Sequence, residues 1–305
     1  MEIIKQLVPS KEATSTALGF FDGVHRGHRA VITEAVEYAR SHGLVPAVFT
    51  LMQSPRTVLL GEEPRAIVTT EEKLSLIEAL GVERVYLIDF TTIRTITAER
   101  FVSDILIGCF NAKHTGCGFN YHFGSGASGN GEILHTLCRQ YGVSETTQPQ
   151  LCYGELPISS TRIRKSIAAG DIPAANEMLG RQYGFRLEVI HGRRLGHRLG
   201  YPTLNQRFPE GLVQPPFGVY GSWVTVDGQR YRGISNIGVK PTVGSDEVLI
   251  ETWLPVYHGR ELYGEVLDIR FDCFVRPERK FNSLDELKAA IEHDRQILAA
   301  GWVQS

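Results

Sequence analysis

The chain has 305 residues, of which 42% are hydrophobic and 22% carry a charge, and its formal net charge is −2. This composition is typical of a folded globular protein and excludes extensive disorder and a collagen-like chain. The near balance of acidic and basic residues gives no general attraction to polyanions, so we expect no nucleic-acid partner. The length predicts two domains of roughly 150 residues each.

We expect neither a membrane segment nor an export signal. No apolar run approaches the ~20 residues that cross a bilayer, and residues 1–15 lack the apolar stretch of a secretory signal. The five cysteines are an odd number and form no CxxC pair, which argues against a zinc site. They favour reduced thiols and therefore a cytoplasmic protein.

In the first half, apolar strands alternate with helical segments. We expect strands at 17–21, 45–49 and 85–88, and helices at 30–42, 71–80 and 98–107. Such alternation predicts an α/β domain in which helices cover a parallel sheet.

The second half has a different pattern, with short β-rich runs separated by glycine and proline turns. The expected strands are 187–190, 219–226, 231–237, 248–254 and 266–274. Strands without intervening helices predict an antiparallel barrel or sandwich, followed by one helix from Ser283, a plausible N-cap, to Ala300. We place the domain boundary so that the domains are residues 1–182 and 183–305.

The strongest chemical signal lies at residues 19–28, where a strand ends, glycines turn the chain and a helix begins. A helix N-terminus offers free N–H groups and the positive end of the helix dipole, and so binds phosphate readily. His25 and His28 are three residues apart and should face the same way. Two imidazoles at such a turn suit phosphate oxygens and charge that develops at an α-phosphorus.

A second stretch, residues 158–164, reads Ile-Ser-Ser-Thr-Arg-Ile-Arg. Ser159 or Ser160 can cap the helix that follows, which is an ordinary structural role. Arg162 in the first turn opposes the helix dipole, and a bound triphosphate would resolve that conflict. Capping and phosphate binding both remain open for this stretch.

A competing signal is the GxGxxG pattern at 124–129, which by itself indicates a dinucleotide-binding dehydrogenase. The preceding residues, 116–123, contain glycines and polar residues and make a poor buried strand. The pattern also lies in the middle of the domain, whereas the dinucleotide fingerprint belongs to the first βα unit. No GxxxxGK[ST] pattern occurs, so we exclude a P-loop kinase.

The HxGH turn and the Ser-Ser-Thr-Arg-Ile-Arg stretch together resemble the adenylyltransferase half of the prokaryotic bifunctional riboflavin kinase/FAD synthetases. The second half carries further family motifs in the same order, at 191–192, 196, 199–205, 218–220, 236–238, 241–242, 251, 262–264, 276 and 280–281. The resemblance implies a Rossmann-like HxGH nucleotidyltransferase domain and an antiparallel β-barrel riboflavin kinase domain with a terminal helix. It also implies two reactions, the phosphorylation of riboflavin to FMN and the adenylyl transfer from ATP to FMN. Mg²⁺ is the implied cofactor, the implied ligands are riboflavin, FMN and ATP, and no protein partner is implied.

For the kinase half, the resemblance assigns Glu251 as the base that takes the proton of the riboflavin 5′-hydroxyl. Thr203 and Asn205 match the residues that hold Mg²⁺ with the ATP phosphates, although both also suit a turn after a proline. The residues implied for ATP binding are Gly192, Gly196, Pro202, Thr203 and Asn205.

For the adenylyltransferase half, the flavin phosphate is the nucleophile, so the protein needs only to position the reactants and to stabilise charge. The implied catalytic residues are His25 and His28. The residues implied for ATP binding are Gly19, Phe20, Asp22, Gly23, His25, His28, Asn120, Ser159, Ser160, Thr161 and Arg162. Flavin contacts are implied for Phe123 and Arg276, with a core aromatic as the alternative for Phe123.

Three positions depart from the family pattern. Ser54 replaces a histidine that assists adenylyl transfer, Leu187 replaces a glycine, and residues 255–257 replace a Leu-Asp-Phe pattern. The first departure keeps an alternative open, namely a flavin- or nucleotide-binding regulator whose adenylyltransferase half is impaired.

Overall fold

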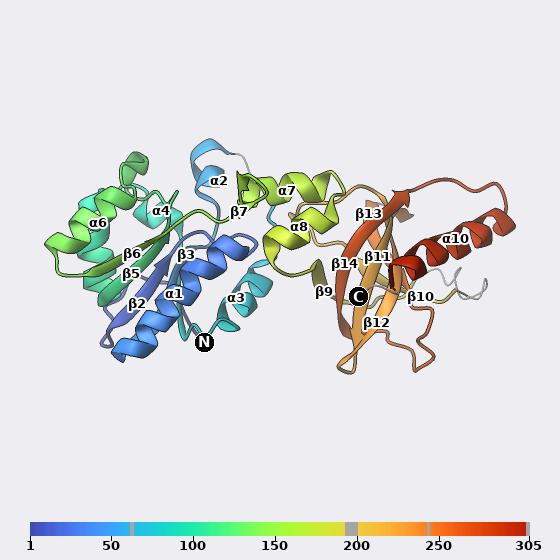
Figure 1. The fold of residues 1–305 in the computed structure, drawn as a ribbon, viewed down its shortest axis with the longest axis horizontal. Coiled ribbons are helices and arrows are strands. Elements are labelled where there is room, and N and C mark those ends of the chain that lie inside the picture. The colour runs from blue at the N-terminus through green and yellow to red at the C-terminus, as the bar shows by residue number, and fades with distance from the viewer. Residues whose placement is uncertain (62–63, 193–200, 243–244, 303–305) are drawn as a thin grey trace. The chain divides into compact units, whose positions relative to one another are not determined.

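The computed structural model describes residues 1–61, 64–192, 201–242 and 245–302. The chain divides into two compact units, Met1–Ser160 and Thr161–Ser305 (Figure 1). This division by packing lies 22 residues before the boundary at residue 182 that the sequence pattern predicts. In the part of the chain that is described, no helix has the length and apolarity needed to cross a membrane.

The first unit is built on a six-stranded parallel sheet, as the alternation predicts. Its strands run in the order β1 (Glu2–Ile4), β4 (Arg84–Ile88), β3 (Val45–Leu51), β2 (Thr14–Leu18), β5 (Ala112–Gly118), β6 (Ser144–Gln148). The remaining elements are α1 (Arg26–His42), α2 (Pro55–Leu60), α3 (Thr70–Glu78), α4 (Phe90–Ile93), α5 (Ala98–Arg100), the π-helix η1 (Phe101–Cys109), the 3₁₀-helix η2 (Ser125–Ala127), α6 (Gly131–Gln140) and the hairpin of β7 (Cys152–Tyr153) and β8 (Leu156–Pro157).

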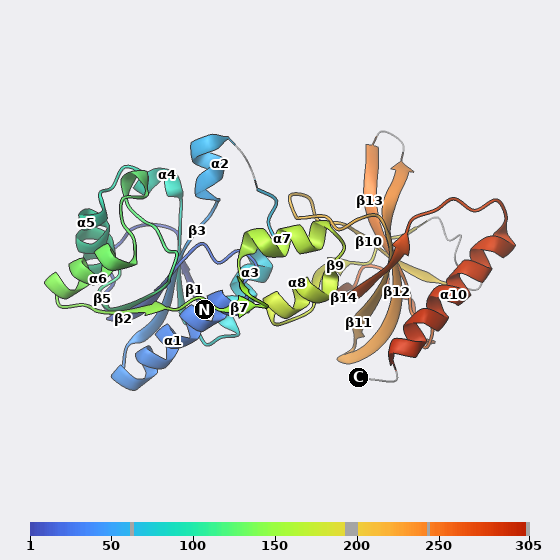
Figure 2. The same cartoon turned by 45° about the horizontal axis from the view of Figure 1, so that its top comes forward.

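Helices cover both faces of this sheet because the strand side chains alternate between two hydrophobic clusters. On β3, Val48 packs with α1 and α3, whereas Ala47 and Phe49 pack on the other face with η1 and α6. Figures 1 and 2 show these two helix layers.

The strand order places a topological switch point between β2 and β5. After β2 the chain adds β3 and β4 on one side, and then returns to add β5 and β6 on the other. In open α/β sheets, ligands bind at the carboxyl ends of the strands at this point. The turn that carries His25 and His28 follows β2, so it lies at this position.

The second unit contains an antiparallel six-stranded sheet, which confirms the predicted barrel-like architecture. Its order is β10 (Thr203–Arg207), β13 (Ser245–Trp253), β12 (Gln229–Thr242), β11 (Gly218–Val226), β14 (Val266–Pro277), β9 (Tyr183–Glu188). A single bridge from Ile190 to Asn205 links the segment after β9 to the opposite edge strand, so the sheet curls towards closure. Helix α10 (Leu284–Trp302) follows the last strand.

Two helices that the sequence pattern assigns to the first domain pack with the second unit. They are α7 (Ser160–Ala168) and α8 (Ile172–Leu179). On α8, Asn176 Nδ2 donates to the carbonyl of Phe271, and Asn176 Oδ1 accepts from the amide of Tyr183. These bonds tie α8 to β14 and β9, which explains why packing divides the chain before it.

Several sequence expectations need correction. The strand expected at 17–21 ends at Leu18, and the next six residues form a turn. The helix expected at 98–107 is mostly π-helical. Strand β5 was not expected, because its sequence AKHTGCG is polar and glycine-rich, yet it lies inside the sheet between β2 and β6.

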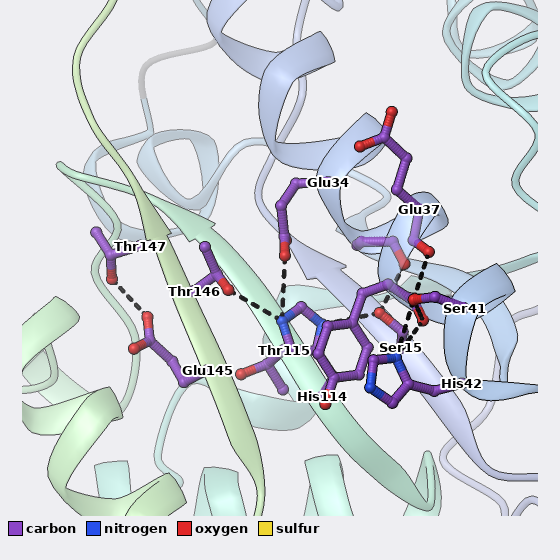
Figure 3. Close-up of polar contacts among 12 residues, drawn as sticks. Ser15, Glu34, Glu37, Ser41, His42, His114, Thr115, Glu145, Thr146 and Thr147 are labelled. Atoms are coloured by element: carbon purple, nitrogen blue, oxygen red, sulfur yellow. Dashed lines mark hydrogen bonds and ion pairs between the residues drawn. The ribbon is translucent and has the colours of Figure 1, made fainter.

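A polar cluster lies beneath α1, towards the amino-terminal ends of β2 and β5 (Figure 3). His114 has 0% exposure, its ring stacks on Tyr38, and its Nδ1 lies 2.8 Å from Ser15 Oγ. Because the Ser15 hydroxyl already donates to the carbonyl of Ala35, Nδ1 of His114 carries the hydrogen. Nε2 of His114 then accepts from Thr146, and Glu34 Oε1 lies 3.4 Å from it.

Candidate active sites

The turn after β2 has an unusual backbone. Phe21, Gly23 and Val24 have φ angles of 54°, 80° and 39°, in the left-handed region that side chains other than glycine rarely adopt. Phe21 and Val24 are buried, so core packing holds this conformation. A Cβ atom on Gly23 would come within 2.9 Å of Ile67, so only glycine fits there. Strain of this kind is concentrated at functional sites.

The two histidines of the turn form one stacked unit. Their ring centroids are 3.5 Å apart with an interplanar angle of 18°, which confirms that they face the same way. His25 is the N-cap of α1, and its Nδ1 accepts from the amide of His28 at 3.2 Å. A neutral His25 therefore carries its hydrogen on Nε2, where it can donate to a phosphate oxygen.

The structure brings together the two stretches for which the sequence suggests phosphate binding, residues 19–28 and 158–164. The Ser160 hydroxyl donates to the carbonyl of Asp22 at 2.9 Å, across 138 residues of sequence. The Asp22 carboxylate is buried and accepts from the amide of Ile67, so it holds the turn in place. Ser159 immediately precedes α7, and Thr161 and Arg162 lie in its first turn.

Asn120 is exposed in the turn that follows β5, on the other side of the switch point from the histidine turn. Gly19 directly follows β2, and its amide donates to the carbonyl of Phe49, while the carbonyl of Phe20 accepts from the Thr50 hydroxyl. Backbone bonds to β3 thus fix the start of the turn.

Phe123 belongs to the hydrophobic core. It is 6% exposed and packs against Phe101 and Tyr121. Of the two alternatives for this ring, the structure supports the core aromatic. The GxGxxG pattern at 124–129 forms a 3₁₀ turn that does not directly follow a strand, which removes the structural context of a dinucleotide fingerprint.

In the second unit, strand register gathers the residues expected for phosphoryl transfer. Asn205 on β10 lies directly opposite Glu251 on β13, and Asn236 on β12 lies opposite Glu251 on its other side. Side chains at directly opposed positions point to the same face of a sheet. Thr203 is two residues before Asn205 and shares this face. Asn236 belongs to the motif at 236–238, which by itself indicates no role for this side chain.

The oxygen donors here suit a hard cation. Asn205 is 6% exposed, and a Cβ on Gly192 would lie 2.5 Å from its amide nitrogen, so the backbone at Gly192 closes over Asn205. The Thr203 hydroxyl and the Asn205 amide are few protein ligands, as is usual for Mg²⁺ that also binds substrate phosphates. Gly196 lies outside the described residues.

A cavity of about 350 Å³ opens beside Thr203. Pro202 and Thr203 line it together with Leu262 and Tyr263, which belong to motifs far apart in sequence. Tyr257, one of the departures from the family pattern, lines it as well, as do His258 and Arg260, which no sequence motif distinguishes. The mixture of apolar walls and polar groups is typical of a small-molecule pocket.

Arg276 makes a bidentate ion pair with Asp294 of α10, with both nitrogen–oxygen distances at 2.8 Å. The Asp294 side chain is 1% exposed, so this pair anchors the terminal helix to β14. A second cavity, of about 460 Å³, is lined by residues 279–281 and by Glu286, Ala289, Ala290 and His293 of α10. The flavin contact of Arg276 stays a prediction.

Comparison with known proteins agrees with this architecture. The FAD synthetase family matches residues 7–162, and the riboflavin kinase family matches residues 179–300. The bifunctional riboflavin kinase/FMN adenylyltransferase of Listeria monocytogenes is 36% identical over 92% of this chain and 90% of its own length. The corresponding protein of Bacillus subtilis is 35% identical over 95% of this chain and 93% of its own length. A crystal structure from Streptococcus pneumoniae, described as a macrolide-efflux protein, has a TM-score of 0.87 with 29% identity, over 97% of this chain and 98% of that one.

The two family matches define the class of the protein, an enzyme that transfers phosphorus-containing groups. Both families match in the order of the two units, and full-length relatives exceed 30% identity. The chain belongs to the bifunctional riboflavin kinase/FMN adenylyltransferase family, and it carries both of the family's enzyme activities.

Proposed function

We propose that this chain makes FAD from riboflavin in two ATP-dependent steps, each in its own site. The first unit, with its histidine turn, transfers the adenylyl group, and the second unit phosphorylates riboflavin. The observation that supports the assignment to the first unit is the bond from Ser160 to Asp22, which joins the two stretches proposed to bind phosphate at the switch point of the sheet. Five free cysteines support a cytoplasmic location.

In adenylyl transfer, a phosphate oxygen of FMN attacks the α-phosphorus of ATP, and the bond to the bridging oxygen of the β-phosphate breaks. Pyrophosphate leaves with the electron pair of that bond, so no protein nucleophile is needed. His25 donates from Nε2 and His28 binds beside it, and both stabilise the oxygens of the α-phosphate. Ser159, Thr161 and Arg162 bind the triphosphate, and Asn120 binds it from the turn after β5.

In phosphorylation, the oxygen of the riboflavin 5′-hydroxyl attacks the γ-phosphorus of ATP and ADP leaves. Glu251 accepts the hydroxyl proton. Thr203 and Asn205 would hold Mg²⁺, which would supply positive charge to neutralise the ATP phosphates. The register that places Asn205 opposite Glu251 keeps the base and the metal-binding side chains on one face.

Ser54 affects the rate expected for adenylyl transfer, the step that forms FAD. Its hydroxyl accepts from the amide of Arg56 and caps α2, so it performs a structural task and offers no imidazole. Adenylyl transfer is therefore expected to rely on His25 and His28. The regulator alternative requires flavin binding without FAD formation, and chromatography of the products distinguishes it.

The test incubates the purified chain with riboflavin, ATP and Mg²⁺ and separates the flavins by chromatography. The wild type is expected to form FMN and then FAD. Glu251→Gln should stop FMN formation and leave FAD formation from added FMN, whereas His28→Ala should do the converse, each by about a hundredfold or more. Glu247→Gln on the same strand and His135→Ala on the exposed face of α6 are matched controls. Parallel loss of both activities in either site variant would refute two separate sites.

A further inference from the structure

Lys73 of α3 is a buried cation next to the histidine turn. It is 5% exposed, and lysine is almost never buried to this degree unless it is paired. Its Nζ donates to the carbonyl of Leu51 at 3.4 Å and lies 5.0 Å from the centre of the Phe20 ring. The carboxylate whose charge acts on it belongs to Asp22, which is already bonded to the amide of Ile67.

These contacts place the ammonium at the carboxyl edge of the sheet. Leu51 is the last residue of β3, and Phe20 lies between the end of β2 and the two histidines. The Thr50 hydroxyl donates to the carbonyl of Phe20, so Lys73 packs against strand ends that are bonded to each other. The positive charge therefore lies beneath the turn expected to bind the ATP phosphates.

Attraction to the buried Asp22 carboxylate offsets only part of the cost of burying this ammonium group, because the larger effect of burial still lowers the pKa of Lys73. Burial of an ammonium group is costly, and an apolar side chain of similar length would fill the same space without that cost. In a site with little water, a fixed positive charge stabilises negative charge across several ångströms. Polyphosphate chemistry at the adjoining turn supplies such negative charge.

We propose that Lys73 is a positioning residue for adenylyl transfer, whose positive charge acts through Phe20 and the histidine turn on the phosphates of ATP. This inference rests on the proposed assignment of adenylyl transfer to the first unit. Lys73 donates no proton in the reaction, and its charge stabilises the electron pair that moves onto the leaving pyrophosphate.

The charge state of Lys73 gives a readout that a packing role would not move. Burial lowers the pKa of Lys73 to about 8, against a smaller opposing effect of Asp22. The other charged groups of its own helix are Glu71, Glu72 and Glu78. The kcat/KM for ATP in adenylyl transfer should therefore fall as the pH rises through about 8.

The test measures FAD formation from FMN, and FMN formation from riboflavin, for Lys73→Met and Lys73→Arg across this pH range. Lys73→Met should lower kcat/KM for ATP in adenylyl transfer about tenfold, lose the fall at basic pH and leave FMN formation unchanged. Lys73→Arg, which keeps the positive charge at all these pH values, should retain adenylyl transfer and should not lose kcat/KM for ATP as the pH rises through about 8. Lys113→Met at an exposed position is the matched control.

A folded Lys73→Met chain with wild-type adenylyl transfer would overturn the proposal. If Lys73→Met does not fold, the proposal would be overturned by Lys73→Arg, should the kcat/KM of this variant for ATP still decrease at basic pH as in the wild type. These failures are distinct from that of the proposed function, which fails if the wild type itself makes no FAD.

Discussion

The buried imidazole of His114 predicts an acid-sensitive first unit. Its side chain has 0% exposure and lies among Ser15, Thr146 and Glu34 (Figure 3). Burial, with a smaller effect of the nearby His42, lowers the pKa of His114 from 6.5 to about 4. The unfolded chain then binds this proton more readily than the folded chain. The stabilisation is therefore complete above pH 6.5 and is lost as the pH falls towards 4.

The size of the effect follows from the two pKa values. With 6.5 in the unfolded chain and about 4 in the folded one, acidification from about pH 7.5 to about pH 5 removes about 2 kcal/mol of unfolding free energy. Glu34 works in the opposite direction. Burial raises the pKa of its carboxyl, as do the carboxylates of Glu145 and Glu37, so its proton uptake on acidification favours the folded state.

Urea unfolding at the two pH values measures this effect. All three tryptophans lie beyond residue 160, so their fluorescence reports the second unit, whereas far-ultraviolet circular dichroism reports both units. His114→Asn, which keeps a donor for Ser15, should be less stable at neutral pH. Its unfolding free energy, measured by dichroism, should lose the decrease on acidification that His114 causes. Glu34→Gln should make that decrease larger than in the wild type. Equal pH dependence in the wild type and in His114→Asn would refute the reasoning.

Two further predictions concern the second unit. Gly192→Ala should displace the Asn205 side chain, because the added Cβ would lie 2.5 Å from the Asn205 amide nitrogen. The KM for MgATP in FMN formation should then rise about tenfold. An unchanged KM would show that Gly192 does not position the metal-binding side chains. Asp294→Asn should weaken the bidentate pair with Arg276 and lower the unfolding free energy of this unit by about 3 kcal/mol, measured by tryptophan fluorescence, and an unchanged midpoint would show that the pair does not anchor α10.

Local sequence determined much of the architecture. The alternation of apolar strands with helices predicted a parallel sheet, and short strands between turns predicted the antiparallel one, because both patterns depend on neighbouring residues. The spacing of His25 and His28 predicted that the rings face the same way, since three residues make nearly one helical turn. Resemblance to the family supplied Thr203, Asn205 and Glu251, which no local pattern distinguishes.

Tertiary structure alone decided which of these segments meet. The position of β5 inside the sheet depends on β2 and β6, and its polar residues give no local strand signal. The bond between Ser160 and Asp22 and the register of Asn205 with Glu251 join residues far apart in sequence, and packing of whole strands sets both. The burial of Lys73 has the same origin: its place on a helix is local, but its environment is made by the ends of β2 and β3.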